Sequence, residues 1–346
     1  MAEATIKVTD PRDDATTPHR PLPIMDVGPF LAGERGALEA LVDGWRDACK
    51  NYGFMCLVNH GFPQSLIDRM DAETRRFHAL PDADKLAIKV NEHQRGYIPS
   101  RATIVTHSQY EKHTKLDSVE CIVVATDYAD DDPNLMAGKQ FYAHNQWPAD
   151  LPGFRETVES YMSTATTLCK RLLPVWAFAL ELEKDFFDPY FVNNYTYFRI
   201  HKYPRVPTID SNEFGLGAHA DTGFMTFLPP ANEPGLQVLG TDDKWFWPIV
   251  PEGAVVLNIG QFLGRWTNDR FRATPHRVLP PKNNDRYSFA CFINTSLEAE
   301  VECLPTCTGP ENPPKYPRQS YWDFFQWYMQ NTYTHYGKVG ASEAAE

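Results

Sequence analysis

Three side chains that can bind a metal ion stand in two short motifs in the second half of the chain. His219 and Asp221 are separated by one residue in GAHADTG, and residues i and i+2 of a β-strand point to the same face. His276 lies in TPHRV, which we expect to belong to a later strand. Two imidazoles and one carboxylate on one face leave iron with open coordination positions. The motifs therefore predict an iron site at His219, Asp221 and His276.

A pair of residues that suits a carboxylate follows ten positions after His276. Arg286 and Ser288, in RYS, are also separated by one residue and share one face of a predicted strand. A guanidinium presents a rigid fork to a carboxylate, and the hydroxyl adds a donor, which is what the far end of a dicarboxylate co-substrate needs. Alone, an H-x-D pair usually contains a hydrogen-bonded histidine of a sheet, and an R-x-S pair usually lies on the surface. In this order, the motifs together indicate a binding site.

The composition favours a globular protein and argues against two classes of partner. Hydrophobic residues make up 42% of the 346 residues and charged residues 23%, as in ordinary folded proteins. The formal charge of −12 argues against nucleic acid and anionic membranes, because both need clustered lysine and arginine. The polar first residues lack the apolar centre of a signal peptide, and no apolar run reaches the roughly 18–20 residues of a membrane span. We expect a cytoplasmic protein with a small-molecule substrate; the oligomeric state stays open.

The cysteines predict reduced thiols rather than a disulfide framework. They are odd in number, scattered, and mostly embedded in apolar runs. The seven are Cys49, Cys56, Cys121, Cys169, Cys291, Cys303 and Cys307. The last two form a close pair, but no second pair of ligands follows to complete a zinc site.

The first half of the ordered chain predicts helices with few strands. We expect a short strand at LPIMDV, a helix from Gly36 to Asn51, a buried strand at GFMCLVNHG and a helix from Pro63 to about Ala79. Residues 91–150 carry a weaker apolar pattern, which predicts mostly loop with one strand near Glu120–Ala125. The sequence leaves open whether this region closes over a site as a lid.

The second half begins with a helix and continues with strands. Apolar residues at helical spacing predict a long helix from Leu151 to about Glu183, and Pro174 should kink it. From Tyr195 onward, short runs rich in Val, Thr, Phe and Tyr alternate with turn residues, which is typical of a sandwich or barrel. A final aromatic helix is expected around Tyr321–Tyr333.

Taken in order, these motifs resemble one family over nearly the whole ordered chain. The segments LPIMDV, YGFMCLVNHGFP, RGY and NQWPADLPGFR are similar to the N-terminal, non-catalytic region of the isopenicillin N synthase-like Fe(II)/2-oxoglutarate-dependent dioxygenases. The segments KYP, GLGAHADTGFMTFL, GAVVLNIGQFLGRW and RYSFACF resemble the oxygenase domain of that family. The ordered combination makes this resemblance highly specific.

The resemblance implies a mainly β fold with flanking helices, built on a double-stranded β-helix, or jelly roll. It implies a non-catalytic region at 21–150, and a helix followed by the oxygenase domain at 151–335, with the β core at 195–298. Residues 1–20 and 336–346 lack apolar periodicity, and we expect them to be flexible tails.

The resemblance also implies Fe(II) at the predicted metal site, with O2 and 2-oxoglutarate as co-substrates. It implies that Tyr203 joins Arg286 and Ser288 around the distal carboxylate of 2-oxoglutarate. The chain departs from the family pattern twice, with His201 where many members have asparagine and Gln261 where many have aspartate. Whether His201 contacts a ligand is therefore open, and Gln261 should alter a structural hydrogen bond rather than the iron.

Candidate substrate contacts lie next to the predicted site or on the last helix. They are Phe224, Phe292, Asn294 and Phe325, each of which can equally be ordinary core packing. Together they favour a small apolar or aromatic metabolite over a highly charged one. We expect hydroxylation with release of succinate and CO2, while desaturation, demethylation and ring closure stay open.

Three other functions fit part of the pattern. A non-haem iron oxidase of the ring-closing or ethylene-forming type would use the same iron ligands without 2-oxoglutarate, and the family's R-x-S pair does not exclude it. A zinc hydrolase would also use two histidines and a carboxylate, but the sequence has no H-E-x-x-H segment to supply a general base. A non-catalytic binding protein with this fold is disfavoured by the intact ligand set.

Overall fold

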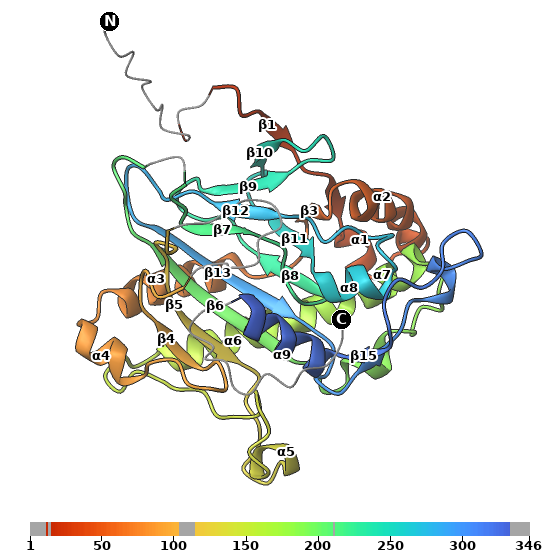
Figure 1. The fold of residues 1–346 in the computed structure, drawn as a ribbon. Coiled ribbons are helices and arrows are strands. Elements are labelled where there is room, and N and C mark those ends of the chain that lie inside the picture. Colours follow the sequence, from red (N-terminus) through yellow and green to blue (C-terminus); the bar gives the residue numbers. More distant parts are fainter. Residues whose placement is uncertain (1–11, 13–14, 104–114, 210–211, 333–346) are drawn as a thin grey trace, which may run out of the picture.

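The computed structural model describes residue 12 and residues 15–103, 115–209 and 212–332. Its strands form two large sheets, and most of its helices lie around them (Figure 1). The helices are α1 Gly28–Leu31, α2 Ala37–Asn51, α3 Gln64–His78, α4 Asp82–Ala87, α5 Pro133–Met136, α6 Phe154–Arg171, α7 Leu173–Ala179, α8 Gln261–Trp266 and α9 Tyr321–Thr332, with 3-10 turns at Asp188–Phe191 and Pro305–Cys307. Within the described ranges, no helix is long and apolar enough to cross a membrane.

The smaller sheet has the strand order β1-β10-β9-β12-β7. Its strands are β1 His19–Pro21, β10 Trp245–Ile249, β9 Leu236–Leu239, β12 His276–Val278 and β7 Leu216–His219. Pairing of β12 with both β7 and β9 is antiparallel, and His276 lies directly opposite His219. This register brings together two residues that are far apart in the sequence.

The larger sheet has the order β2-β3-β11-β8-β13-β6-β5-β4. Its strands are β2 Ile24–Asp26, β3 Phe54–Val58, β11 Val255–Ile259, β8 Met225–Leu228, β13 Arg286–Ile293, β6 Thr196–Tyr203, β5 Glu120–Ala125 and β4 Gly96–Ile98. A small pair, β14 Glu300–Val301 with β15 Gln319–Ser320, lies outside both sheets. The two facing sheets and flanking helices are the jelly-roll arrangement expected from the sequence.

Helices α3 and α6 pack on the outer face of the larger sheet (Figure 1). Tyr161 of α6 stacks on Phe198 of β6 at 5.2 Å and contacts Phe289 of β13 edge-on at 5.4 Å. Because side chains alternate along a strand, the residues on either side of Phe198 and Phe289 point to the inner face, toward the other sheet. The hydrophobic core under the helices thereby decides which residues of β6 and β13 face the space between the sheets.

The predicted helices are largely confirmed. Those expected at 36–51 and 63–79 are α2 and α3, each within one residue of the predicted ends. The long helix is broken at Leu172 into α6 and α7, and Pro174 sits in the first turn of α7, where its missing amide costs no hydrogen bond. The short elements α4, α5 and β4 were not predicted, because each is too short to show a periodic pattern.

The expected N-terminal tail at 1–20 is partly wrong. His19 and Arg20 belong to β1, which pairs in parallel with Trp247 and Pro248 of β10. Arg20 also donates to Asp242 at 2.8 Å. This polar edge strand carries no apolar alternation, so its pairing cannot be read from the sequence. The tail expected at 336–346 lies outside the described residues, as do residues 104–114 of the region that we considered as a lid.

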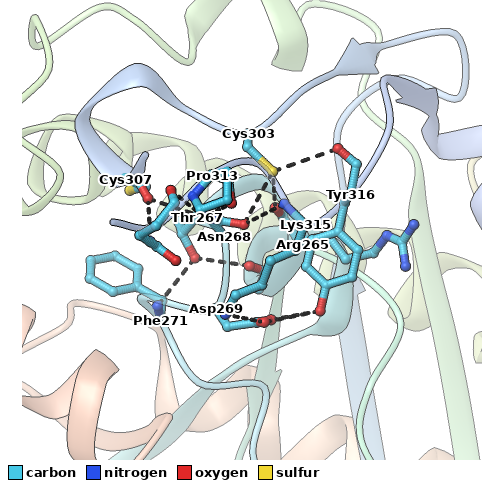
Figure 2. A network of polar contacts seen from close by, with 12 residues as sticks. Arg265, Thr267, Asn268, Asp269, Phe271, Cys303, Cys307, Pro313, Lys315 and Tyr316 are labelled. Carbon is cyan, nitrogen blue, oxygen red and sulfur yellow. Dashed lines mark hydrogen bonds and ion pairs between the residues drawn. The ribbon is translucent and has the colours of Figure 1, made fainter. Parts of the chain in front are cut away.

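Asn268, just after α8, ties down the segment that leads to the last helix (Figure 2). Its buried side-chain amide donates to the carbonyls of Pro313 at 3.1 Å and Cys307 at 3.4 Å. Its carbonyl oxygen accepts from the backbone of Lys315 at 2.9 Å and lies 3.5 Å from the thiol of Cys303. Its φ of 51° is a left-handed conformation that asparagine tolerates better than most residues. One side chain therefore fixes several turns of the connecting segment.

Neighbouring contacts reinforce this attachment. The hydroxyl of Tyr316 donates to Asp269 at 2.9 Å, and the guanidinium of Arg265 lies 4.3 Å from the centre of the Tyr316 ring (Figure 2). The segment is thereby held on α8, and α9 begins directly after it at Tyr321. The position of α9 over the sheets thus depends on this polar network.

Asp117 fastens the segment before β5 to the strand that ends at His219. Its carboxylate accepts a hydrogen bond from the backbone of Gly217 at 2.9 Å. Burial raises the pKa of Asp117 to about 7, although the Gly217 amide and the Arg199 guanidinium both favour the charged form. Ionised Asp117 therefore destabilises the folded state relative to the neutral acid.

We predict that Asn268→Ala lowers the free energy of unfolding by about 2–4 kcal/mol, because it leaves several buried backbone groups without partners. Urea unfolding measures the change. Asn284→Ala is the control, since Asn284 is exposed and makes a side-chain hydrogen bond to Glu233, and we expect a loss of roughly 0.5 kcal/mol or less. Equal losses in the two variants would contradict the role assigned to Asn268.

We predict that Asp117→Asn flattens the pH dependence of stability. The folded pKa of about 7 is higher than that of an aspartate in an unfolded chain, roughly 3.9, so the stability contributed by the neutral acid is lost as pH rises through 7. The amide keeps an acceptor for Gly217 and cannot ionise. As the pH rises from 5 to 8, the wild type should lose about 2–3 kcal/mol of unfolding free energy that the variant keeps. Urea unfolding at each pH measures this difference. Parallel pH profiles for the two proteins would contradict this account, and the exposed Asp150→Asn serves as the control.

Candidate active site

A cavity lies between the two sheets. Its walls are the inner faces of β6 and β13, the facing ends of β7 and β12, and side chains of β8, β9 and β11. Phe325, Tyr328 and Met329 of α9 complete the lining. The walls are mostly apolar, with two separate groups of polar side chains, which is the usual character of a site for a small organic ligand.

The first polar group is formed by His219, Asp221 and His276. His219 is the last residue of β7, His276 is the first of β12, and Asp221 lies just beyond the end of β7. Oδ1 of Asp221 is 3.6 Å from Nε2 of His219 and 3.5 Å from Nε2 of His276. Across the described ranges, this is the group of histidine, cysteine and acidic side chains placed to hold a metal ion. The expectation that Asp221 lies within the strand is wrong, because the strand ends first and the turn aims the carboxylate.

Backbone carbonyls orient both imidazoles. Nδ1 of His219 lies 2.8 Å from the carbonyl of Gly217, and Nδ1 of His276 lies 3.1 Å from that of Thr274. A carbonyl only accepts, so Nδ1 carries the hydrogen in each neutral ring. Each Nε2 is then left with a lone pair that faces Asp221, as a metal ligand requires.

Two further side chains hold the other oxygen of Asp221. Oδ2 accepts from the hydroxyl of Thr226 at 2.6 Å and from the side-chain amide of Asn258 at 2.7 Å. Thr226 on β8 and Asn258 on β11 lie directly opposite each other in the larger sheet. With Oδ2 occupied in this way, Oδ1 alone faces the two histidines.

The turn after Asp221 is fixed by Gln261, one of the two departures from the family pattern. Its backbone amide donates to the carbonyl of Asp221 at 2.7 Å, and its side-chain amide donates to that of Ala220 at 2.8 Å. The structural role expected for this residue is therefore confirmed.

The charges of the triad are coupled. Burial opposes ionisation of Asp221, but the electrostatic effect of His276 and His219 outweighs burial and lowers its pKa well below the usual value. Burial and the neighbouring His276 lower the pKa of His219. Burial alone would lower the pKa of His276 too, but the Asp221 carboxylate raises it. The site therefore presents an anionic carboxylate and a neutral His219.

The second polar group lies on β6 and β13. Arg286 is opposite Tyr203 in the register, and Ser288 follows on the same inner face. Nε of Arg286 donates to the carbonyl of Glu233 at 3.1 Å, and its guanidinium lies 5.0 Å from the centre of the Tyr203 ring. Its Nη1 is buried and has no hydrogen-bond partner among the described residues. A buried guanidinium with a donor left over is suited to an incoming anion.

Two more side chains of β6 reach the cavity from the same face. Arg199 and His201 alternate with the residues that pack under the helices, and both are buried. His201 stacks on Tyr203, with ring centroids 5.6 Å apart. Burial and the nearby guanidinium groups of Arg199 and Arg286 keep the pKa of His201 well below its ordinary value, so its imidazole is neutral.

The four predicted substrate contacts divide into two pairs. Phe292 and Phe325 line the cavity. Phe224 instead lies in the aromatic core, with its ring 5.5 Å from that of Trp176, and Asn294 accepts a hydrogen bond from the backbone of Phe224 at 3.1 Å. The prediction of Phe224 and Asn294 as cavity residues was wrong, because the turn after the H-x-D motif points Phe224 away from the metal ligands.

Four polar residues of this region were not predicted from the sequence, namely Thr226, Asn258, Asp117 and Arg199. Asn258 stands in the motif NIGQ, and Arg199 lies two residues before His201. Both are therefore next to residues that the sequence singled out, but no pattern indicated a role for them. Their functions depend on pairing between strands that the sequence alone does not define.

Two family models match the chain. Residues 22–150 match the model described as the N-terminal region of the non-haem dioxygenase in morphine synthesis. Residues 187–295 match the 2OG-Fe(II) oxygenase superfamily, and this range includes all three residues of the triad and Arg286.

Relatives with similar sequences agree with the family models. The 2-oxoglutarate-Fe(II) type oxidoreductase hxnY of Emericella nidulans is 33% identical over 303 residues, which cover 85% of each chain. Kihadalactone A synthase LFS of Citrus sinensis is 35% identical over 79% of this chain and 82% of its own.

Solved structures share the fold. A 2OG-Fe(II) oxygenase family protein from Caulobacter crescentus superposes with a TM-score of 0.76 at 28% identity, covering 89% of this chain and 97% of its own. A full-length Neurospora crassa protein in complex with alpha-KG, which is 2-oxoglutarate, also has a TM-score of 0.76, at 25% identity, with 89% and 95% covered. With the sequence relatives and the jelly-roll cavity, these findings show that the chain belongs to the 2-oxoglutarate–Fe(II) oxygenase superfamily.

Proposed function

We propose that His219, Asp221 and His276 hold Fe(II) in this oxygenase, and that Arg286, Ser288 and Tyr203 hold the distal carboxylate of 2-oxoglutarate. Members of the family are oxidoreductases that use Fe(II), 2-oxoglutarate and O2. The assignment of these six residues is our inference from the geometry of the cavity.

The arrangement of the triad carries the proposal. Two Nε2 atoms and one Oδ1 converge from two segments of the chain that are far apart in sequence, and the remaining atom of each side chain is already hydrogen-bonded. Such a set gathers a buried carboxylate and two imidazole nitrogens at one point, where a bound cation would compensate the negative charge of Asp221. The donor set of two nitrogens and one oxygen fits Fe(II).

The polar group at Arg286 fits the second ligand. 2-Oxoglutarate has a carboxylate at each end, and the family's chemistry places one end at the metal. The other end then needs a cation within the same cavity, and Nη1 of Arg286 is buried there without a partner among the described residues. The hydroxyls of Ser288 and Tyr203 are further donors on the same wall.

The chain's own residues bind, orient and shield. When bound, Fe(II), 2-oxoglutarate and O2 supply the oxidation, in which 2-oxoglutarate is converted to succinate and CO2. Thr226 and Asn258 keep the carboxylate of Asp221 in one orientation, and Arg286 sets the direction of the co-substrate in the cavity. Side chains of α9 cover the cavity and keep bulk water away from the reacting groups.

The apolar part of the cavity favours a small apolar or aromatic metabolite as the prime substrate. Phe292 of β13 and Phe325 and Met329 of α9 provide surfaces for such a molecule. The formal charge of −12 further favours a small molecule over nucleic acid. We propose hydroxylation as the outcome. The cytoplasmic location and the division into regions 21–150 and 151–335 stay predictions.

The direct test measures succinate. Protein purified without oxygen is supplied with Fe(II), ascorbate and 2-oxoglutarate, air is admitted, and succinate is measured with and without a library of small aromatic and aliphatic metabolites. We expect succinate to rise with particular library members in the wild type and not in Asp221→Ala. Succinate formation by Asp221→Ala at the wild-type rate would overturn the assignment of the triad.

We predict that Asn258→Ala weakens Fe(II) binding by roughly 10- to 100-fold, because Asp221 loses one of the two donors that orient it. The dissociation constant is measured anaerobically by competition with a chelator. Thr226→Ser is the matched control, since it keeps a hydroxyl beside Oδ2 and should bind Fe(II) nearly as the wild type does. Unchanged Fe(II) affinity in a folded Asn258→Ala protein would show that Thr226 alone suffices.

We predict that Arg286→Ala weakens 2-oxoglutarate binding by about 2–5 kcal/mol with little change in Fe(II) affinity, because the distal carboxylate loses a buried charged partner. Calorimetric titration of metal-loaded protein in the absence of oxygen measures both ligands. Arg277→Ala is the control, since Arg277 lies on β12 next to His276 but its guanidinium lies 4.2 Å from the ring of Trp245 instead of lining the cavity. Equal 2-oxoglutarate affinity in the two variants would remove Arg286 from the site.

A further inference from the structure

His201 is a buried histidine that faces the cavity with both ring nitrogens unsatisfied. It is 4% exposed, and within the described part of the chain neither Nδ1 nor Nε2 has a hydrogen-bond partner. Buried polar atoms in folded proteins nearly always have a partner, and an exception costs stability. The atoms of His201 therefore need an explanation that the other described residues do not provide.

The other buried histidines outside the triad do not share this property. His60 has Nε2 3.0 Å from the carbonyl of Gly253, and its Nδ1 accepts from the amide of Phe62 at 3.0 Å. His78 has Nε2 3.3 Å from the carbonyl of Ile200, and its Nδ1 lies 3.6 Å from Glu120. Both are structural residues outside the cavity lining. Nδ1 of His78 also lacks a hydrogen-bond partner, but within the described residues His201 is the buried histidine in which both ring nitrogens lack one.

The place of His201 in the sheet tells which ligand it can reach. It lies opposite Ser288 in the register of β6 and β13. The pair formed by Tyr203 and Arg286 is two residues further along each strand. Its ring is stacked on that of Tyr203 with an interplanar angle of 25°. Within the described residues, the ring of His201 and Nη1 of Arg286 both lack hydrogen-bond partners. The two residues occupy neighbouring positions on the same wall of the cavity.

The neutral state of His201 suits it to this place. A neutral imidazole has one N–H donor and one acceptor, and it can donate to a carboxylate without adding a third positive charge between Arg199 and Arg286. The low pKa of its imidazole, caused by burial and by the two guanidinium groups, keeps it neutral at physiological pH. The backbone of Ser288 favours the charged ring but is outweighed, and it makes no hydrogen bond of normal geometry with either nitrogen. A cation at this position would instead be repelled from both sides.

We infer that His201 is a co-substrate-binding residue, whose ring N–H donates a hydrogen bond to 2-oxoglutarate when the distal carboxylate lies on Arg286. The inference rests on the proposed function, which places 2-oxoglutarate on this wall. The bound ligand would give one of these nitrogens a hydrogen-bond partner, which would offset part of the stability that the protein loses by burying them.

The experiment combines ligand affinity with the stability of the ligand-free protein. The variants are His201→Leu, which removes both ring nitrogens, and His201→Asn, which keeps an amide donor. His78→Leu is the matched control, because it makes the same change at an equally buried histidine that contacts the opposite face of β6. Binding of 2-oxoglutarate to Mn(II)-loaded protein is measured by anaerobic calorimetry, and Tm is measured without ligands.

We expect His201→Leu to weaken 2-oxoglutarate about tenfold, as for the loss of one hydrogen bond to a charged group, while the Tm of the ligand-free protein stays equal or rises. Leucine is apolar and removes two unsatisfied atoms, which explains the second effect. His201→Asn should recover most of the affinity. His78→Leu should show the reverse pattern, with a lower Tm and unchanged 2-oxoglutarate binding.

Two results would overturn the inference. Unchanged 2-oxoglutarate affinity in His201→Leu would show that the residue does not contact the co-substrate, even if turnover of a prime substrate fell. A lower Tm in ligand-free His201→Leu, like that of His78→Leu, would assign a structural role instead. The proposed function fails separately, through unchanged 2-oxoglutarate affinity in Arg286→Ala, so the two outcomes are distinguishable.

Discussion

The structure depends on holding one buried carboxylate in a fixed direction. Asp221 stays ionised inside the protein only because hydrogen-bond donors and histidines surround it on both sides. Thr226 and Asn258 take Oδ2 from the larger sheet, and His219 and His276 approach Oδ1 from the smaller one. The carboxylate therefore lies where the two sheets meet, and a displacement of either sheet would leave a buried charge without part of its compensation. The requirement of the proposed metal site and the requirement for a stable jelly roll coincide at this residue.

A second constraint comes from the alternation of side chains along β6 and β13. The aromatic residues Phe198 and Phe289 pack under α6, which commits the residues between them and beyond them to the cavity. The same pairing of strands that builds the hydrophobic core thus assembles the polar wall that contains His201 and Arg286. Nitrogens of His201 and Arg286 on this wall have no hydrogen-bond partner among the described residues, which costs stability. Such local conflicts between stability and chemistry are expected at binding sites.

The cavity also depends on parts of the chain that lie far from the metal ligands. Helix α9 contributes Phe325 and Met329 to the lining, and its position follows from the attachment of the preceding segment to Asn268. On the other side, Asp117 joins the segment before β5 to the strand that ends at His219. Both attachments use buried polar side chains that bind backbone groups, so they fix geometry with little contribution from apolar burial.

The sequence by itself determined the chemistry and the main elements of this protein. The types, order and spacing of His219, Asp221, His276 and Arg286 sufficed to predict that these side chains meet in one cavity, although Asp221 lies beyond the end of β7 and not on the strand. The periodic segments predicted α2 and α3, because the local spacing of apolar residues decides which face of a helix is buried. The tertiary structure alone decided that Asn258 supports the carboxylate and that Phe224 packs in the core. It also decided which polar atoms of the cavity wall stay unsatisfied. These features depend on the register between strands distant in sequence and on the direction of the turn after β7, which local spacing does not encode.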